Sequence, residues 1–260
     1  MTIYCTGGRG RVGKELVELG IKPLEFNILD RDQIRIALLT LQEGDVVCHL
    51  AGISDVDYCE KIEYRDVVIA TNVRSVFNIA AEAEARKCGM VVISTDHIFS
   101  GGNFLGLGRG PYKENAKPNP QNFYAQTKLS AESFVGWFRD YKIVRTSRLF
   151  SKNGLEKDIL HHNDYPTFIH RSFVSIENFS ASLKAYLDRF WEMPSILHVS
   201  GDKTISWYDF MKYCCEKEGW KEPTPRTKES NTFYAKRPKY GGLDCSLAKS
   251  LAIPIFDYTK

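Results

Sequence analysis

The stretch Ile-Tyr-Cys-Thr-Gly-Gly-Arg-Gly-Arg-Val-Gly at residues 3–13 decides the fold of this chain. A short apolar strand runs directly into Gly7, Gly10 and Gly13, which have the spacing G-x-x-G-x-x-G at the start of a helical pattern. Glycine lets a tight turn adopt dihedral angles that other residues avoid, and a phosphate can then approach the backbone. The helix N-terminus that follows supplies amide donors and a positive dipole. The stretch therefore predicts a dinucleotide-binding βαβ unit.

Strand and helix patterns alternate along the first 150 residues. We expect strands at 2–6, 24–29, 45–51, 90–94 and 142–145, and helices starting at 12 and covering 31–41, 67–88 and 122–138. Alternation of this kind builds a parallel sheet that is covered by helices on both faces. The predicted fold class is a Rossmann-like, doubly wound α/β domain with a small C-terminal substrate-binding lobe.

The pattern weakens after about residue 150, where 154–166 reads as irregular and polar. We therefore predict an NAD(P)-binding domain at 1–150, to which 172–198 returns, and a small substrate-binding lobe at 151–171 and 199–260. The lobe is expected to close over the carboxyl ends of the strands. A loop at 100–121, rich in glycine and proline, is expected to form part of the active-site rim, because connections of this length in compact domains are usually functional.

Composition narrows the possible partners. The chain is 43% hydrophobic and 26% charged, as in ordinary globular domains, and its net charge of +3 is dispersed, which argues against nucleic acid as a partner. No apolar run approaches the ~18 residues that a membrane span needs, and no signal peptide is recognisable. The seven cysteines show neither metal-ligand nor disulfide spacing. We expect a cytoplasmic protein with reduced, buried thiols, no membrane partner and no bound metal.

A tyrosine and a lysine, Tyr124 and Lys128, stand one helical turn apart in a predicted helix, so the phenol and the ammonium share a face. A free tyrosine has a pKa near ~10, and a neighbouring cation favours its phenolate. Thr95 ends the strand at 90–94, at the sheet edge where parallel sheets meet ligands. Thr95 can hydrogen-bond a carbonyl oxygen while Tyr124 delivers a proton, and Lys128 can also hold the nicotinamide ribose. The three residues predict a carbonyl-reducing site.

Two arginines, Arg9 and Arg11, lie within the glycine turn. A guanidinium here can pair with an adenosine 2′-phosphate, which favours NADPH, or can be solvated at the surface. An acid about 20 residues after the glycines would instead favour NADH. Glu25 and Asp30 are the nearby acids. We predict NADPH as the cofactor, with NADH as the alternative.

The motifs, taken in order, resemble the extended short-chain dehydrogenase/reductase family, and within it the dTDP-4-dehydrorhamnose reductases. Ser-Thr-Asp-His-Ile-Phe-Ser-Gly at 94–101 and Tyr-Ala-Gln-Thr-Lys-Leu-Ser-Ala-Glu at 124–132 are similar to reductase motifs, as are Asp-Val-Val-Cys-His-Leu-Ala-Gly-Ile-Ser-Asp-Val-Asp at 45–57 and Arg-Thr-Ser at 145–147. Two positions depart from the family pattern. His97 replaces the usual Tyr, and Arg148 stands where Trp is usual.

The resemblance implies reduction of the C4 ketone of a nucleotide-activated 4-keto-6-deoxy sugar, and a homodimer is one option. It supplies further site residues. Those expected at the cofactor are Val12, Asp30, Leu50, Ala51, Gly52 and Asn72. Those expected at the substrate are Ser54, Asp57, Thr95, His97, Arg148, Arg171 and Trp207. Arg171 is expected either at the substrate pyrophosphate or in a structural ion pair, and Trp207 either on the ligand or in the lobe core.

Two other functions stay open. A dehydratase or epimerase of the same fold needs a carboxylate base after Thr95-Asp96, where this chain has His97. A reductase-like fold can also serve as a non-catalytic regulatory subunit that binds dinucleotide and a partner protein. An intact set of Thr95, Tyr124 and Lys128 favours the enzyme over the subunit.

Overall fold

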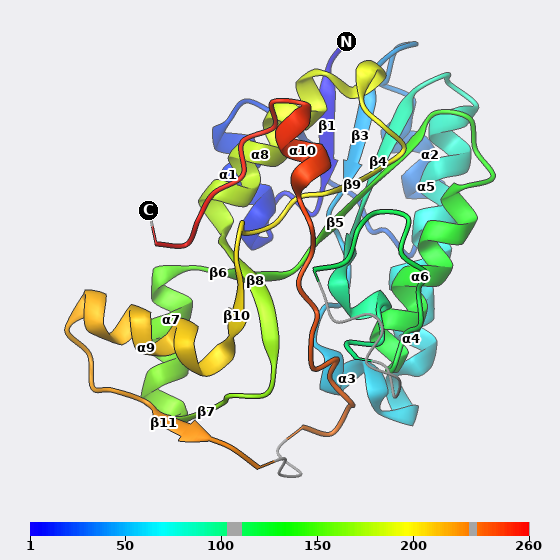
Figure 1. The fold of residues 1–260 in the computed structure, drawn as a ribbon. Helices are drawn as coiled ribbons and strands as arrows, with labels where there is room; N and C mark the ends of the chain where they lie inside the picture. Colours follow the sequence, from blue (N-terminus) through cyan, green and yellow to red (C-terminus); the bar gives the residue numbers. More distant parts are fainter. Residues whose placement is uncertain (103–110, 229–232, 260) are drawn as a thin grey trace.

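A computed structural model describes residues 1–102, 111–228 and 233–259. Its centre is a parallel sheet of six strands in the order β2-β1-β3-β4-β5-β9 (Figure 1). The strands are β1 (Ile3–Thr6), β2 (Lys22–Pro23), β3 (Val46–His49), β4 (Gly89–Thr95), β5 (Tyr141–Thr146) and β9 (Ile196–His198). The order reverses between β1 and β3, which is the switch point where such sheets bind ligands. This architecture confirms the predicted Rossmann-like fold class.

Helices cover both faces of the sheet (Figure 1). One face carries α1 (Arg11–Glu18), α8 (Ile176–Asp188) and α10 (Ser246–Ser250), and the other α2 (Arg31–Leu38), α5 (Ser75–Glu84) and α6 (Phe123–Val135). Buried aliphatic residues pack each layer against the strands: Leu16 and Leu183 belong to the first core, Ile34 and Ile79 to the second. Two faces that both exclude water explain why the strands read as continuous apolar runs.

A series of short helical segments leads into α5. It starts with α3 (Val56–Glu60), the 3₁₀ turn Ile62–Tyr64 and α4 (Arg65–Ile69), and a π-helical turn at Ala70–Arg74 joins α4 to α5. The single helix expected at 67–88 is thus interrupted by a π turn at Asn72. Such turns are rare and often accompany functional sites.

Two regions differ from the sequence-based prediction. The second strand lies at Lys22–Pro23, and 24–29 forms a turn that leads into the Asp30 cap of α2. The segment expected to be irregular instead contains α7 (Lys152–His161) and β7 (Asp164–Pro166). The Ser151 hydroxyl caps α7 by accepting a hydrogen bond from the Gly154 amide, and Leu155 packs into the lobe core. Gly154 and the polar residues around it are the reason why this helix was not predicted from the sequence.

The small lobe stands beside the carboxyl ends of the central strands (Figure 1). It contains a second sheet in the order β10-β8-β6, a two-stranded sheet β11-β7, and the helices α7 and α9. The bounds are β6 (Arg148–Phe150), β8 (His170–Ser175), β10 (Thr204–Ser206), α9 (Trp207–Glu218) and β11 (Thr224–Arg226). Because only Ser147 separates β5 from β6, one continuous segment carries the chain from the central sheet into the lobe.

The last part of the chain leaves the lobe and returns to the central sheet. Residues 233–242 cross beside α3, where Asp57 pairs with Arg237 at 3.0 Å and accepts a hydrogen bond from the Ala235 amide at 2.7 Å. Cys245 and Ala248 then pack into the core beneath α8. The sequence placed all of 199–260 in the lobe, whereas α10 belongs with the sheet. Residues 103–110 of the predicted rim loop 100–121 lie outside the described residues.

Candidate active site

A cavity of about 500 Å³ lies at the carboxyl ends of the central strands, between the sheet and the lobe. Many of the predicted residues line it: Gly7, Gly10, Arg11, Val12, Gly13, Leu50, Gly52, Ser54, Thr95, His97, Tyr124, Lys128, Arg148 and Arg171. The predicted residues outside its lining are Arg9, Asp30, Ala51, Asp57, Asn72 and Trp207. The glycine turn and the hydroxyl groups of Thr95 and Tyr124, which were predicted separately, therefore line the same cavity.

The glycine turn has the shape that a dinucleotide phosphate needs. Gly7 has a φ of +68°, and a Cβ added at Gly13 would lie 2.2 Å from the Gly7 carbonyl oxygen. Gly10, the N-cap of α1, has no side chain to cap the helix, so the first amides of α1 remain available. The N-terminus of a helix with free amides attracts anions. The residues present thus fit the diphosphate of a nicotinamide dinucleotide.

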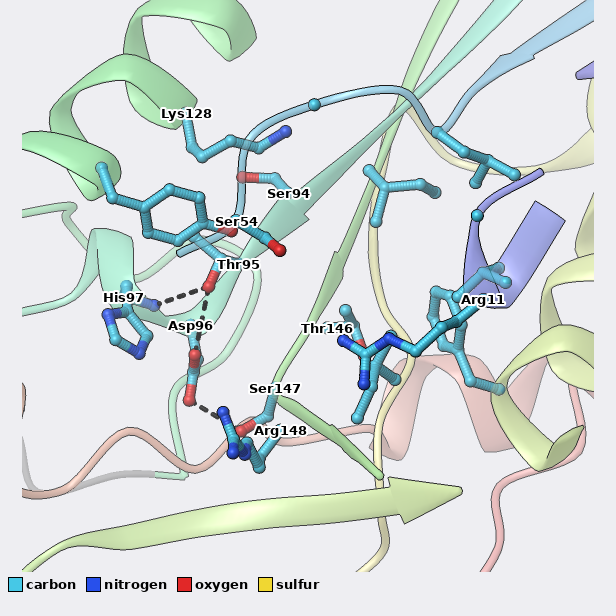
Figure 2. Close-up of a pocket in the computed structure, with 18 of the residues that line it drawn as sticks. Arg11, Ser54, Ser94, Thr95, Asp96, His97, Lys128, Thr146, Ser147 and Arg148 are labelled. Carbon is cyan, nitrogen blue, oxygen red and sulfur yellow. Dashed lines mark hydrogen bonds between the residues drawn. The ribbon is translucent and has the colours of Figure 1, made fainter. Parts of the chain in front are cut away.

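Two hydrogen bonds hold the Thr95 hydroxyl at the end of β4, and Tyr124 lines the same cavity. The Thr95 hydroxyl donates to Asp96 Oδ1 at 3.2 Å and accepts from the His97 amide at 3.2 Å (Figure 2). Burial raises the pKa of Tyr124 well above its usual value, and a hydrogen bond with Thr95 partly opposes that rise. Tyr124 is therefore a neutral phenol here, which differs from the lowered pKa expected from the sequence.

Lys128 points into the same pocket as Thr95 (Figure 2). Burial lowers the pKa of Lys128 to about 8, and the carboxylate of Glu132 opposes the decrease. Glu132 stands one helical turn further along α6, where it holds Arg145 through two contacts of 2.7 and 3.0 Å. Sequence reasoning overlooked Glu132, although its spacing from Lys128 puts both on one helix face.

A buried ion pair lies directly beneath the hydroxyl groups. Asp96 Oδ2 is 3.3 Å from Arg171 Nε and accepts a 2.7 Å hydrogen bond from Ser147. Burial raises the pKa of Asp96, while Arg171 and then Ser147 lower it. Gly241 packs so closely that an added Cβ would lie 2.8 Å from Asp96 Oδ2. Arg171 thus forms the structural ion pair, one of the two roles predicted for it, and also lines the cavity.

Several predicted residues act at a distance from the cavity. Asn72 accepts from the Ile53 amide at 2.8 Å and donates to the Ile53 carbonyl at 2.9 Å, so it holds the loop after β3. Asp57 is engaged by residues 233–242, as described above. Asp30 caps α2 by accepting from the amides of Asp32 and Gln33, and these contacts lower its pKa.

The adenosine end of the site contains an ion pair between Arg9 and Glu25 that was not predicted from the sequence. Arg9 forms an exposed ion pair of 2.9 Å with Glu25, which follows β2 by two residues. Because the second strand ends at Pro23, Glu25 rather than Asp30 is the acid beside the glycine turn.

The lobe side of the cavity is formed by Arg148 and its neighbours. Arg148 is the first residue of β6, and its guanidinium carbon lies 4.8 Å from the ring centroid of Trp207. Trp207 lines a second cavity of about 110 Å³, together with Arg11 and Arg148. The ring of Phe233 stacks on Trp207 with centroids 6.3 Å apart. Trp207 therefore supports Arg148 rather than facing the main cavity.

Three further observations concern partners and chemistry. All seven cysteines are free and buried. Within the described ranges, no cluster of His, Cys, Asp or Glu has the arrangement of a metal site. In the same parts of the chain, none of the helices is long and apolar enough to span a bilayer.

The fold and the Thr95, Tyr124 and Lys128 set define an NAD(P)-dependent oxidoreductase of the extended short-chain dehydrogenase/reductase class. Within that class, the chain belongs to the family described as RmlD substrate binding domain, which matches residues 1–169.

Named relatives point in two directions. The chain is 26% identical over 232 residues to the spore coat polysaccharide biosynthesis protein SpsK of Bacillus subtilis, covering 84% of this chain and 79% of that one. It is also 26% identical over 254 residues to methionine adenosyltransferase 2 subunit beta of Bos taurus, covering 88% and 71%. The crystal structure of dTDP-4-dehydrorhamnose reductase from Bacillus anthracis in complex with NADP superposes with a TM-score of 0.86 at 23% identity, covering 99% and 95%. That structural likeness supports the fold.

Proposed function

We propose that the protein reduces the C4 ketone of a nucleotide-activated 4-keto-6-deoxy sugar with NADPH. The observation that carries this proposal is that Thr95, Tyr124 and Lys128 line one cavity with the glycine turn. The family match and the NADP in the Bacillus anthracis reductase support the cofactor.

The proposed chemistry uses the phenol as an acid. Bound NADPH would supply the hydride. A ketone oxygen placed between Thr95 and Tyr124 accepts one hydrogen bond from the phenol and one from the Thr95 hydroxyl, whose proton turns to it from Asp96. The phenol proton then passes to that oxygen to complete the alcohol. The raised pKa keeps the proton on Tyr124 until the oxygen becomes basic. The Lys128 ammonium stabilises the phenolate that remains.

The direct test is nicotinamide oxidation, followed by absorbance, with a dTDP-4-keto-6-deoxy sugar as substrate. Wild-type protein should consume NADPH in step with the sugar. Tyr124→Phe removes the acid and keeps the ring, so we expect turnover to fall about 10²- to 10⁴-fold, the usual contribution of a general acid. NADPH affinity should change little. Full activity in Tyr124→Phe would refute the mechanism.

An epimerase or dehydratase remains the first rival, and the geometry argues against it. Asp96 is held by Arg171 and Ser147, and burial keeps His97 neutral by lowering its pKa well below the usual value. Asp96 is therefore not free to act as a base, and an imidazole with so low a pKa is a weak base. Turnover of the sugar without net oxidation of NADPH would favour this rival.

A non-catalytic regulatory subunit is the second rival, and the likeness to methionine adenosyltransferase 2 subunit beta favours it. Such a protein would bind NADPH but would not oxidise it with any nucleotide-linked 4-keto sugar. It would also form a complex with a purified methionine adenosyltransferase in sedimentation velocity. Both results together would replace the reductase proposal.

A further inference from the structure

Two arginines at or near the cavity are neutralised by a carboxylate. Arg171 pairs with Asp96, and Arg237 pairs with Asp57. In the part of the chain that the structure describes, the guanidinium groups of Arg11 and Arg148 have neither an ion pair nor a hydrogen bond, although both line the main cavity.

We infer that Arg148 binds the diphosphate of the substrate and so selects diphosphate-linked sugars. This inference rests on the proposed function and assigns a ligand group to one side of the site. From the sequence, Arg171 was a candidate for that diphosphate. Arg171 instead forms an ion pair with the buried Asp96, and the nearby Arg237 forms one with the half-buried Asp57.

The position of Arg148 assigns it to the substrate rather than to the cofactor. Arg148 belongs to β6, a strand of the lobe sheet, and rests on Trp207 of α9. Arg11 instead begins α1 in the glycine turn, next to the free amides that fit the cofactor phosphates. Figure 2 shows the two side chains entering the pocket from these separate elements. Arg11 is thus placed for the cofactor phosphates and Arg148 for the substrate.

Electrostatics favour an anion between the lobe and the sheet. The Arg148 side chain stays open to the cavity, yet its protein surroundings lower its pKa, chiefly by burial. Asp158 opposes that shift, whereas Arg11 and Arg237 add to it by repulsion. A cleft with excess charge of one sign concentrates ligands of the other sign. The planar guanidinium matches phosphate oxygens in a bidentate way, and the Trp207 ring fixes its plane.

Arg148 is one of the two positions at which this chain departs from the reductases that it resembles. Arg148 stands where Trp is usual in that family, so the charge is a property of this chain. Arg148→Trp would keep an aromatic contact with Trp207 but remove the charge. Arg148→Lys would keep the charge but lose the flat, two-pronged geometry.

The test is calorimetric titration of NADP⁺-saturated protein with dTDP, UDP and dTMP, which needs no turnover. Arg148→Met and Arg148→Trp should weaken dTDP or UDP binding about 10- to 100-fold, the worth of a charge-assisted hydrogen bond, and dTMP binding by less. Arg148→Lys should recover part of the loss. Affinity for NADP⁺ should not change. Arg35→Met is the matched control, because Arg35 is an exposed residue of α2 paired with Asp32.

The outcomes separate this inference from the proposed function. If wild-type protein binds a nucleoside diphosphate and Arg148→Met binds it equally well, the assignment of Arg148 is wrong and the reductase proposal stands. If Arg148→Met loses NADP⁺ and dTDP affinity to the same extent, Arg148 serves the cofactor and the assignment is again wrong. If wild-type protein binds neither dTDP nor UDP, both proposals fail.

Discussion

The two walls of the cavity differ in whether their charged side chains are paired. On the catalytic wall, formed by β4, β5 and α6, Glu132 neutralises Arg145, and Asp96 is neutralised by Arg171, which reaches it from β8 of the lobe sheet. All four side chains are at most 5% exposed. On the lobe wall, formed by β6 and α9, Arg148 rests on the Trp207 ring and forms no ion pair among the described residues. The catalytic wall is thus complete before any ligand arrives, whereas the lobe wall leaves one charge for a ligand to satisfy.

This difference suggests a division of roles, with catalysis on the first wall and selection of the substrate on the second. A catalytic group works best when packing and hydrogen bonds hold it in place beforehand. A group that selects a ligand gains most when its partner comes with that ligand. We therefore expect changes on the catalytic wall to affect stability and proton transfer, and changes on the lobe wall to affect substrate affinity.

The largest effect is expected when the pair beneath Lys128 is broken. Glu132→Gln leaves Arg145 buried without a countercharge, and breaking a buried ion pair in this way costs about 3–5 kcal/mol of unfolding free energy. Urea denaturation measures the loss.

Glu43→Gln is the control, because Glu43 meets Lys87 at 3.1 Å in a pair that is 70% exposed on both sides. Exposed pairs contribute about 0–1 kcal/mol. Equal stability of the two variants would show that the catalytic wall does not depend on its internal pairing.

The pH dependence of catalysis tests whether the Lys128 cation is needed. Since burial lowers the pKa of Lys128 to about 8, kcat/KM should fall as the pH rises through that value, by about tenfold per pH unit. Glu132 holds this pKa up, so Glu132→Gln, where it folds, should move the decline to lower pH.

Stability should respond to the same titration with the opposite sign. Lys128 has a lower pKa when folded than its ordinary 10.5, so between about pH 8 and 10.5 the unfolded chain binds the proton more tightly. The contribution of Lys128 to stability therefore rises with pH in that window. Activity that stays constant from pH 7 to 10 would contradict the role of the cation; parallel loss of activity and of folded protein would point to unfolding instead.

The same contrast explains what the sequence could and could not predict. Local rules located the glycine turn, the Tyr124–Lys128 pair and Thr95, because each depends on spacing within one strand or helix. Ion pairs such as Asp96 with Arg171 join residues far apart in the chain, so only the folded structure could show that Arg171 forms one. The α7 helix was overlooked because Gly154, a poor helix former, lies in its first turn, where the Ser151 cap compensates.

The smallest effect, on cofactor preference, is expected at the adenosine end of the site. Removing Glu25 there would leave Arg9 without an ion pair, just as Arg148 is on the lobe wall. Glu25 neutralises Arg9 at 2.9 Å, and its carboxylate would repel a 2′-phosphate. Glu25→Ala should therefore raise the NADPH-to-NADH ratio of kcat/KM about two- to fivefold, the range typical of solvent-exposed charge interactions. Arg9→Ala should lower that ratio, since it removes the cation and leaves the acid. The two variants should respond in opposite directions and should leave the KM for the sugar unchanged. A shift of both ratios in the same direction would show that neither residue contacts the 2′ position, and the paired charges would then be part of the surface rather than of the site.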